Sequence, residues 1–210
     1  MKFSLIHKSL PAALVGCTVA ISASQAQAEV SAETAYVFST FSFLIHGILV
    51  MFMAAGFAML ESGLVRAKNT ATICLKNIAL YSLAGIAFYL VGYNLMYVDV
   101  PEGGFIGTLS LLYNPSVDEL ALINAGKATP EMVGKVIEGG YSVSSDWFFQ
   151  MVFVATAASI VSGTVAERIK VWPFMIFVIV LSSVIYPIQA SWVWGGGWLD
   201  ALGFTDFAGS

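Results

Sequence analysis

The chain has 210 residues, of which 58% are hydrophobic and only 10% are charged, with a formal net charge of −4. Soluble globular domains carry about 25% charged residues, so this composition and a mean hydropathy of +0.83 indicate an integral membrane protein. The sequence has no Lys/Arg cluster of the kind that binds nucleic acid. It also has no metal-ligand cluster, nucleophile motif or phosphate loop. We therefore expect no enzyme activity, no catalytic residue, no metal site and no cofactor.

The N-terminal 28 residues have the three parts of a secretory signal peptide. Lys2 and Lys8 form the basic start, residues 10–22 form a short apolar core, and an A-Q-A sequence ends at Ala28. We therefore predict a signal peptide over residues 1–28 that is removed by cleavage after Ala28.

A second form of processing stays open at Cys17. The sequence L-V-G-C that ends at this residue resembles a lipoprotein cleavage box, which would leave a lipidated cysteine at the new N-terminus. We favour cleavage after Ala28, because the apolar run continues past Cys17. Cys74 is then the only cysteine of the mature chain, so no intrachain disulfide is expected.

Four segments are apolar over a length that suits a membrane-spanning helix, which takes about 20 residues. They run from about residue 36 to 60, 71 to 98, 147 to 165 and 171 to 192. A long acidic stretch separates the second from the third, and its one apolar piece, Phe105 to Tyr113, is too short to span and is expected at the interface. The sequence predicts an all-α integral membrane fold, with one domain over residues 29–210.

The distribution of basic residues predicts the orientation of these spans. The connection after the first span contains Arg66 and Lys68, and the connection after the third contains Arg168 and Lys170. The long second connection is acidic by comparison. By the positive-inside rule the first and third connections are cytoplasmic. The mature N-terminus is then outside, which agrees with a cleaved signal peptide.

Several polar residues lie within the spans or at their ends, among them a histidine, a lysine and two glutamates. We interpret His46 as a helix-packing histidine that bonds to a neighbouring hydroxyl or carbonyl. Lys76 lies about one turn into the second span, so we expect its ammonium group to reach the cytoplasmic headgroups. Glu61 and Glu167 lie at cytoplasmic ends beside arginines, where ion pairing or capping is expected.

The third span has two distinct faces. Phe149 and Phe153 are four residues apart and so lie on one face. Ala155, Ser159 and Gly163 form a stripe of small residues, which lets membrane helices pack closely. Taken alone, the two rings are typical of lipid or core packing, and the tryptophans near residue 194 fit an interfacial aromatic belt.

The C-terminal part of the sequence combines an aromatic residue, glycines and an acid. Trp194 is followed by three glycines, which allow close backbone approach or a positive φ. Asp206 follows in the sequence D-F-A-G-S. A single acid at the mouth of a membrane span is usually functional.

Three strings taken together resemble the ammonium transporter (Amt/Rh) family. They are G-L-V-R-A-K-N at Gly63–Asn69, A-E-R at Ala166–Arg168, and W-G-G-G from Trp194 followed by D-F-A-G-S from Asp206. The last combination is the most specific, since it opens the signature of that family. The resemblance covers about residues 36–210, nearly the whole mature chain.

The resemblance implies a homotrimer whose subunits each have eleven helices around a narrow hydrophobic pore. Phe153 looks like the upper ring of the family's phenylalanine gate, with Phe149 and Gln150 as its flanking F-Q. Trp194 looks like the tryptophan of the outer ammonium recruitment site, and Asp206 resembles the buried acid that shapes that site. The family's paired pore histidines and second gate phenylalanine match no residue here, so we expect this chain to be the N-terminal part of such a transporter.

The function implied is transport of ammonium and methylammonium across a bacterial inner membrane, by a multi-pass protein in the lipid bilayer. Family members also bind a PII-type regulatory protein on the cytoplasmic face. Two alternatives stay open: an ammonium-sensing membrane domain joined to a signalling domain, and an inactive transporter fragment.

Overall fold

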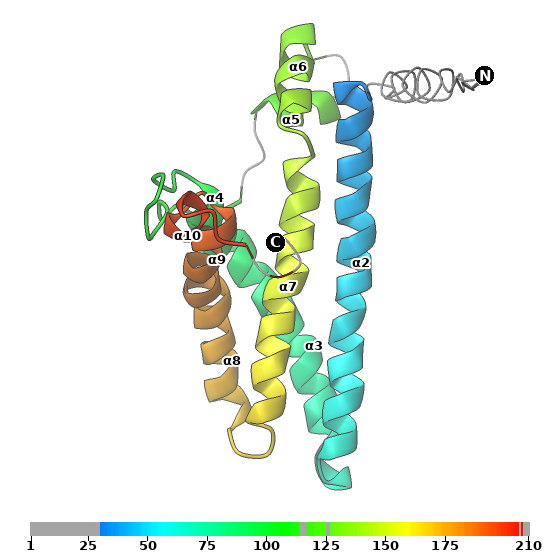
Figure 1. Ribbon diagram of the computed structural model, residues 1–210. Coiled ribbons are helices and arrows are strands. Elements are labelled where there is room, and N and C mark those ends of the chain that lie inside the picture. The colour runs from blue at the N-terminus through cyan, green and yellow to red at the C-terminus, as the bar shows by residue number, and fades with distance from the viewer. Residues whose placement is uncertain (1–29, 114–116, 125–126, 206, 208–210) are drawn as a thin grey trace, which may run out of the picture.

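The computed structural model describes residues 30–113, 117–124, 127–205 and 207. Within these residues the chain is all-helical, without a strand, and four long helical units lie side by side (Figure 1). Each unit is long and apolar enough to cross a membrane. The predicted all-α membrane fold with four spans is confirmed. The predicted signal peptide, Cys17 and Asp206 lie outside the described residues.

Two of the four units are single helices and two are interrupted. The first unit is α2 (Ala32–Leu64) and the third is α7 (Val143–Thr164). The second unit consists of α3 (Thr70–Ala87), a π-helical turn (Phe88–Gly92) and α4 (Tyr93–Tyr97). The fourth consists of α8 (Val171–Val180), a π-helical turn (Leu181–Ile185) and α9 (Tyr186–Trp194). The shorter helices are α5 (Val117–Ile123), α6 (Pro130–Glu138) and α10 (Trp198–Ala201).

The two π-helical turns pack against each other where the second and fourth units approach closely. A Cβ atom on Gly92 would lie 2.5 Å from the Ser182 carbonyl oxygen and 2.5 Å from the Phe88 ring. Only glycine fits at such a contact between backbones. The outer halves of these two units are thereby held together.

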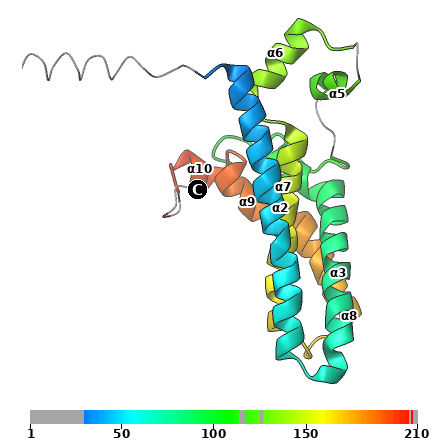
Figure 2. The same ribbon diagram turned by 90° about the vertical axis from the view of Figure 1, so that its right-hand side faces the viewer.

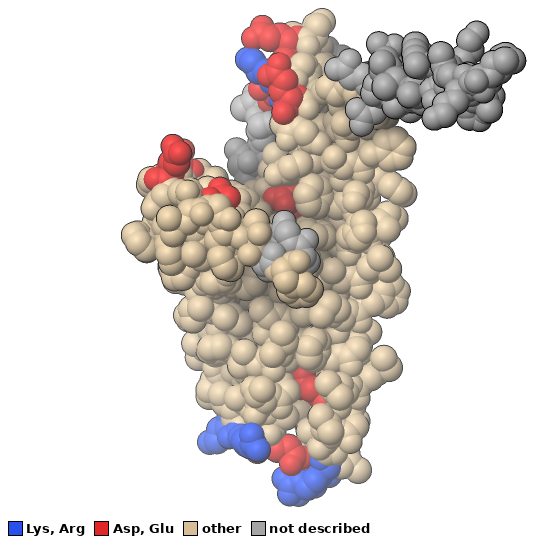
Figure 3. All heavy atoms as spheres, viewed as in Figure 1, with Lys and Arg blue, Asp and Glu red and all other residues tan. Residues whose placement is uncertain are grey.

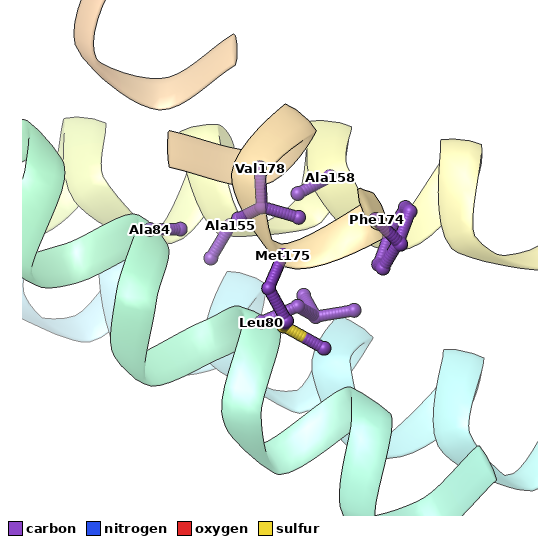
Figure 4. Packing of buried hydrophobic residues seen from close by; sticks show 7 residues of the cluster. All are labelled: Leu80, Ala84, Ala155, Ala158, Phe174, Met175 and Val178. Atoms are coloured by element: carbon purple, nitrogen blue, oxygen red, sulfur yellow. The ribbon is translucent and has the colours of Figure 1, made fainter. Parts of the chain in front are cut away.

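The core of the bundle lies between α3, α7 and α8. Small residues of α7 let the neighbouring helices approach, and larger residues of α3 and α8 fill the space. Figure 4 shows this cluster, which consists of Leu80, Ala84, Ala155, Ala158, Phe174, Met175 and Val178. Ala155 and Ser159 are fully buried, so this part of the predicted small-residue stripe is a packing face.

Helix α2 packs against α7 and, less extensively, against α3. A Cβ atom on Gly47 would lie 2.8 Å from the Phe148 ring, so this contact also depends on glycine. Gly47 and Glu61 are the buried residues of α2. Much of the remaining surface of this apolar helix is uncovered within the described residues.

The two ends of the bundle differ in charge, as the sequence predicts. Figure 3 shows Lys and Arg gathered at the lower end, where the α2–α3 and α7–α8 connections lie. Figures 1 and 2 place α5 and α6 at the opposite end. Figure 3 shows most of the visible Asp and Glu atoms toward that end. We call these the basic end and the acidic end.

The apolar segment Phe105–Tyr113 forms no helix. It runs along the acidic end of the second unit, where the Leu112 and Tyr113 amides donate hydrogen bonds to the Leu90 and Tyr89 carbonyls at 2.7 and 2.8 Å. The Asn94 side chain donates to two more carbonyls of the same segment. The structure therefore confirms that this segment does not span.

Candidate functional site

A cavity of about 490 Å³ opens at the acidic end of the spans. Its lining comes from α2, α4, α7, α9 and the residues just before α7. Six of the lining side chains are aromatic, one is an amide and one is a carboxylate: Phe43, Tyr97, Tyr141, Phe149, Phe153, Trp194, Gln150 and Asp146. We call this the outer cavity.

The rings of the outer cavity form a connected wall. Phe149 and Phe153 lie edge to face with ring centroids 5.0 Å apart, as expected for residues one turn apart on α7. Phe43 of α2 meets Phe149 at 5.1 Å and Tyr141 at 4.8 Å, again edge to face. Such contacts fix the ring planes. Phe43 was missed in the sequence, since no local pattern pairs it with α7.

Trp194 ends α9 and lines the same cavity, with 45% of its surface exposed. The three glycines that follow are needed for the turn that places it. Gly196 has φ +81°, and a Cβ atom on Gly197 would lie 2.6 Å from the Ser191 carbonyl oxygen. A Cβ atom on Gly195 would collide with the Met96 carbonyl oxygen. The prediction of close approach and a positive φ at this triplet is confirmed.

The glycine turn is tied to the loop that follows α4. The Gly103 amide donates to the Gly196 carbonyl at 3.2 Å, and the Trp198 amide donates to the Gly104 carbonyl at 3.0 Å. The Trp192 indole N–H donates to the Phe105 carbonyl at 2.7 Å. This loop therefore holds the end of α9, and with it Trp194, in place.

Among the residues that the structure describes, Asp146 is the one acid in the lining of the outer cavity. It lies in the first turn of α7, and its Oδ2 accepts a hydrogen bond from the Tyr93 hydroxyl at 2.9 Å. Gln150, one turn further on, donates to the Tyr97 hydroxyl at 2.9 Å. From the sequence alone, Asp146 was assigned only to the acidic loop. Its spacing could have indicated a place in the site, because it lies on the same face of the helix as Phe149, Gln150 and Phe153.

Of the predicted site residues, Phe149, Phe153 and Trp194 are brought together in one cavity. Asp206 lies outside the described residues, so its role stays a prediction. His46 is exposed on α2 and does not line the cavity. Its Nδ1 bonds to the Ser42 carbonyl at 2.8 Å, as expected, whereas its exposed side chain does not support the expected role in helix packing.

The expectation for Lys76 is wrong. Its side chain is only 4% exposed and does not reach toward the headgroups. Its Nζ lies 3.2 Å from Glu61 Oε2 and donates to the Ser162 carbonyl at 3.0 Å, while the Ser162 hydroxyl donates to the same Glu61 oxygen at 2.8 Å. A buried ammonium group needs a partner for its charge, and the Glu61 carboxylate and the Ser162 carbonyl provide it. The ion pairing expected of Glu61 is thus made across the bundle with α3.

Glu167 joins the two connections at the basic end. Its carboxylate accepts hydrogen bonds from the Asn69 amide at 2.6 Å and the Arg66 backbone N–H at 2.9 Å, and it lies 3.1 Å from Arg66 Nε. The Asn69 bond and then the Arg66 backbone bond lower the pKa of Glu167. Arg168 instead donates to the Thr164 carbonyl at the end of α7. The R-A-K-N and A-E-R strings thus contact each other.

A model of the Ammonium Transporter Family matches residues 41–210. The chain belongs to the ammonium transporter family. A relative from Synechocystis sp. is 38% identical over 209 residues, which cover 99% of this chain and 43% of that protein. The ammonium transporter Amt2 of Archaeoglobus fulgidus is 41% identical over 179 residues, which cover 80% of this chain and 33% of that protein. The chain therefore spans less than half the length of these curated relatives.

Solved structures of the family share the same fold. One described as a sensor Amt protein has a TM-score of 0.64 and 32% identity, covering 84% of this chain and 41% of that chain. Mep2 of Candida albicans has a TM-score of 0.60 and 25% identity, covering 86% of this chain and 37% of that chain. The four helical units described above are thus a part of the ammonium transporter fold.

Proposed function

We propose that this chain forms the first four spans and the outer substrate cavity of an ammonium transporter that also carries methylammonium. The observation that carries the proposal is that Phe149, Phe153 and Trp194 line one aromatic cavity at the acidic end. The family that the chain belongs to, and the name of the relative from Archaeoglobus fulgidus, support ammonium as the substrate.

The aromatic wall suits a small nitrogen cation. Ammonium resembles potassium in charge and size, so charge alone does not select it. A cation over an aromatic face gains about 0.5–2 kcal/mol, and Trp194 would supply this face at the mouth. Phe153 would close an apolar constriction that no hydrated ion passes cheaply. A neutral amine passes such a constriction at lower cost, so we expect deprotonation near Phe153.

The charge of the two ends supports an orientation in a bacterial inner membrane. The basic end, with Arg66, Lys68, Arg168 and Lys170, would face the cytoplasm. The outer cavity and the mature N-terminus would then face outward, after removal of a signal peptide over residues 1–28. A homotrimer and binding of a PII-type protein at the cytoplasmic face belong to the same proposal.

Replacing Trp194 tests the substrate cavity. In the full-length gene product that carries this sequence, Trp194→Ala should raise the half-saturating methylammonium concentration roughly two- to thirtyfold, the equivalent of one cation–π contact. The measurement is uptake of labelled methylammonium in cells that lack their own ammonium transporters. Trp172→Ala is the matched control, because Trp172 is 80% exposed near the start of α8 and lines none of this cavity. An unchanged half-saturating concentration in Trp194→Ala would overturn the assignment.

The 210-residue chain alone should not support methylammonium uptake. The family's pore is enclosed by more helices than four, and one face of α2 is uncovered here. The measurement is the same uptake assay, with membrane insertion checked by immunoblot. Uptake equal to that of a complete family member would contradict this expectation.

An ammonium sensor is the second candidate, and the resemblance to a structure described as a sensor Amt protein favours it. A sensor and a transporter would share the outer cavity but differ in output. If the full-length protein binds methylammonium and gives no uptake, the sensor is favoured. Measurable uptake that Trp194→Ala weakens favours the transporter.

A further inference from the structure

The buried carboxylate of Asp146 has no cationic partner among the described residues. The residue is 3% exposed. Its two hydrogen-bond donors are the Tyr93 hydroxyl and the Gln150 side chain, and both are neutral. The ion pairs within 4.0 Å among the described residues join Arg66 to Glu167, Lys76 to Glu61, and Lys135 to Glu131. Asp146 takes part in none of them.

An uncompensated carboxylate in an apolar surrounding is costly, and a cation that arrives beside it removes much of that cost. The surroundings of Asp146 offer such a cation a place. Asp146 lines the outer cavity together with the rings of Tyr97, Phe149 and Trp194. A cation held there would gain the attraction of the carboxylate and of the ring faces together.

We propose that Asp146 is a cation-binding residue of the outer cavity, which supplies the negative charge that attracts ammonium between the aromatic rings. This inference rests on the proposed function and adds a residue that the sequence analysis did not include in the site. Trp194 and the phenylalanines provide faces without formal charge, whereas Asp146 provides the charge. Tyr93 acts as a positioning residue, since its hydroxyl holds one carboxylate oxygen.

The composition of the site selects a monovalent cation. Calcium takes six to eight oxygen ligands and magnesium about six, whereas the described lining of this cavity contains one carboxylate. Two neutral donors already bond to the carboxylate, so part of its charge is stabilised before a cation arrives. The cation is therefore attracted without being trapped, which transport requires.

The test separates the charge of Asp146 from its shape. In the full-length gene product, Asp146→Asn keeps an acceptor for Tyr93 and removes the charge. We expect the half-saturating methylammonium concentration to rise about tenfold, the effect of losing one charge-assisted contact. Asp200→Asn is the matched control, because Asp200 is an exposed acid of α10 at the same end and does not line the cavity. It should change the value by less than about twofold.

Tyr93→Phe is the second variant, since it keeps the carboxylate and removes only its hydrogen bond. We expect a smaller rise than in Asp146→Asn. An equal rise in both variants would mean that hydrogen bonding or packing, and not the charge, is responsible. An unchanged value in Asp146→Asn would also overturn the proposal.

Binding to the purified full-length protein is measured in parallel, by the change in tryptophan fluorescence as methylammonium is added. If the unmodified protein binds but does not transport, the transport function fails while the role of Asp146 is still tested. If Asp146→Asn does not accumulate in membranes, carbodiimide labelling of the unmodified protein replaces it. Methylammonium should slow labelling at Asp146, and labelling that is absent or independent of methylammonium contradicts the proposal.

Discussion

Glu61 and Asp146 are both buried carboxylates, with exposed fractions of 2% and 3%, and they lie at opposite ends of the bundle. At the basic end, Glu61 is paired with Lys76 at 3.2 Å, and Ser162 bonds to both side chains. At the acidic end, Asp146 has neutral donors only. Among the described residues, Glu61 thus has a cationic partner and Asp146 has none.

This difference separates a structural charge from a charge kept for a ligand. The Glu61–Lys76 pair joins α2 to α3, and Ser162 adds α7, so three spans meet at one point. Glu61 also lines a cavity, at the basic end, and its Oε1 has no hydrogen-bond partner within the described residues, but Lys76 offsets its charge. Asp146 lines the outer cavity, and none of the ion pairs among the described residues includes it.

Breaking the buried pair should cost most. Lys76→Met leaves Glu61 as an unpaired buried charge, which costs about 3–5 kcal/mol. It also removes the ammonium group that lies 5.1 Å from the Phe174 ring centroid. The measurement is the free energy of unfolding in detergent. The double variant Glu61→Gln/Lys76→Met should regain most of the loss, and a double variant as unstable as Lys76→Met would contradict the pairing.

Neutralising Asp146 should affect stability far less. Because no cation depends on this carboxylate, Asp146→Asn should leave the free energy of unfolding within about 1 kcal/mol of the unmodified protein, or raise it. The measurement is the same as for Lys76→Met. A loss as large as that of Lys76→Met would mean that Asp146 is structural, and the contrast between the two ends would fail.

The contribution of Glu167 at the basic end to stability should depend on pH. Hydrogen bonds from Asn69 and Arg66 lower the pKa of Glu167 in the folded protein. Its contribution to stability is therefore fully present above the ordinary glutamate pKa of about 4.3 and is lost as the pH falls through the lower folded value. Acidification from pH ~6 to ~3.5 should lower the Tm of the unmodified protein more than that of Glu167→Gln.

Glu138→Gln is the control for this measurement, because Glu138 is an exposed acid of α6. Its Tm should fall on acidification as much as that of the unmodified protein. If Glu167→Gln behaves in the same way as Glu138→Gln, the bonds to Glu167 contribute nothing measurable.

The smallest effect is expected at an exposed ion pair. Lys135 and Glu131 are 3.0 Å apart on α6, but their side chains are 58% and 78% exposed. Lys135→Ala should change the free energy of unfolding by no more than about 0.5 kcal/mol, since water screens such pairs. A cost near that of Lys76→Met would show that burial does not decide the value of an ion pair in this protein.

Much of the fold could be predicted from the sequence. The four spans follow from apolar length, and the charge of the two ends follows from where Lys and Arg occur. The small residues of the third span predicted a packing face, which Ala155 and Ser159 form. The turn after Trp194 could be anticipated because only glycine allows such backbone contacts.

The partners of the buried charges could not be predicted in this way. Lys76 is 15 positions from Glu61 along the chain and Asp146 is 53 from Tyr93, and no local pattern encodes these contacts. From its place in the span alone, Lys76 was expected to reach the headgroups. The packing of α3 between α2, α7 and α8 puts it beside a carboxylate instead.

The membrane class, the number of spans, the charge difference between the two ends and the motifs of the ammonium transporter family could all be read from the sequence. These features depend on composition and on residues that are close along the chain. Which buried charges are paired with an opposite charge could be seen only in the tertiary structure, because pairing depends on which helices pack together. Phe43 and Asp146 could be assigned to the site only from the tertiary structure, because α2, α4, α7 and α9 pack around one cavity.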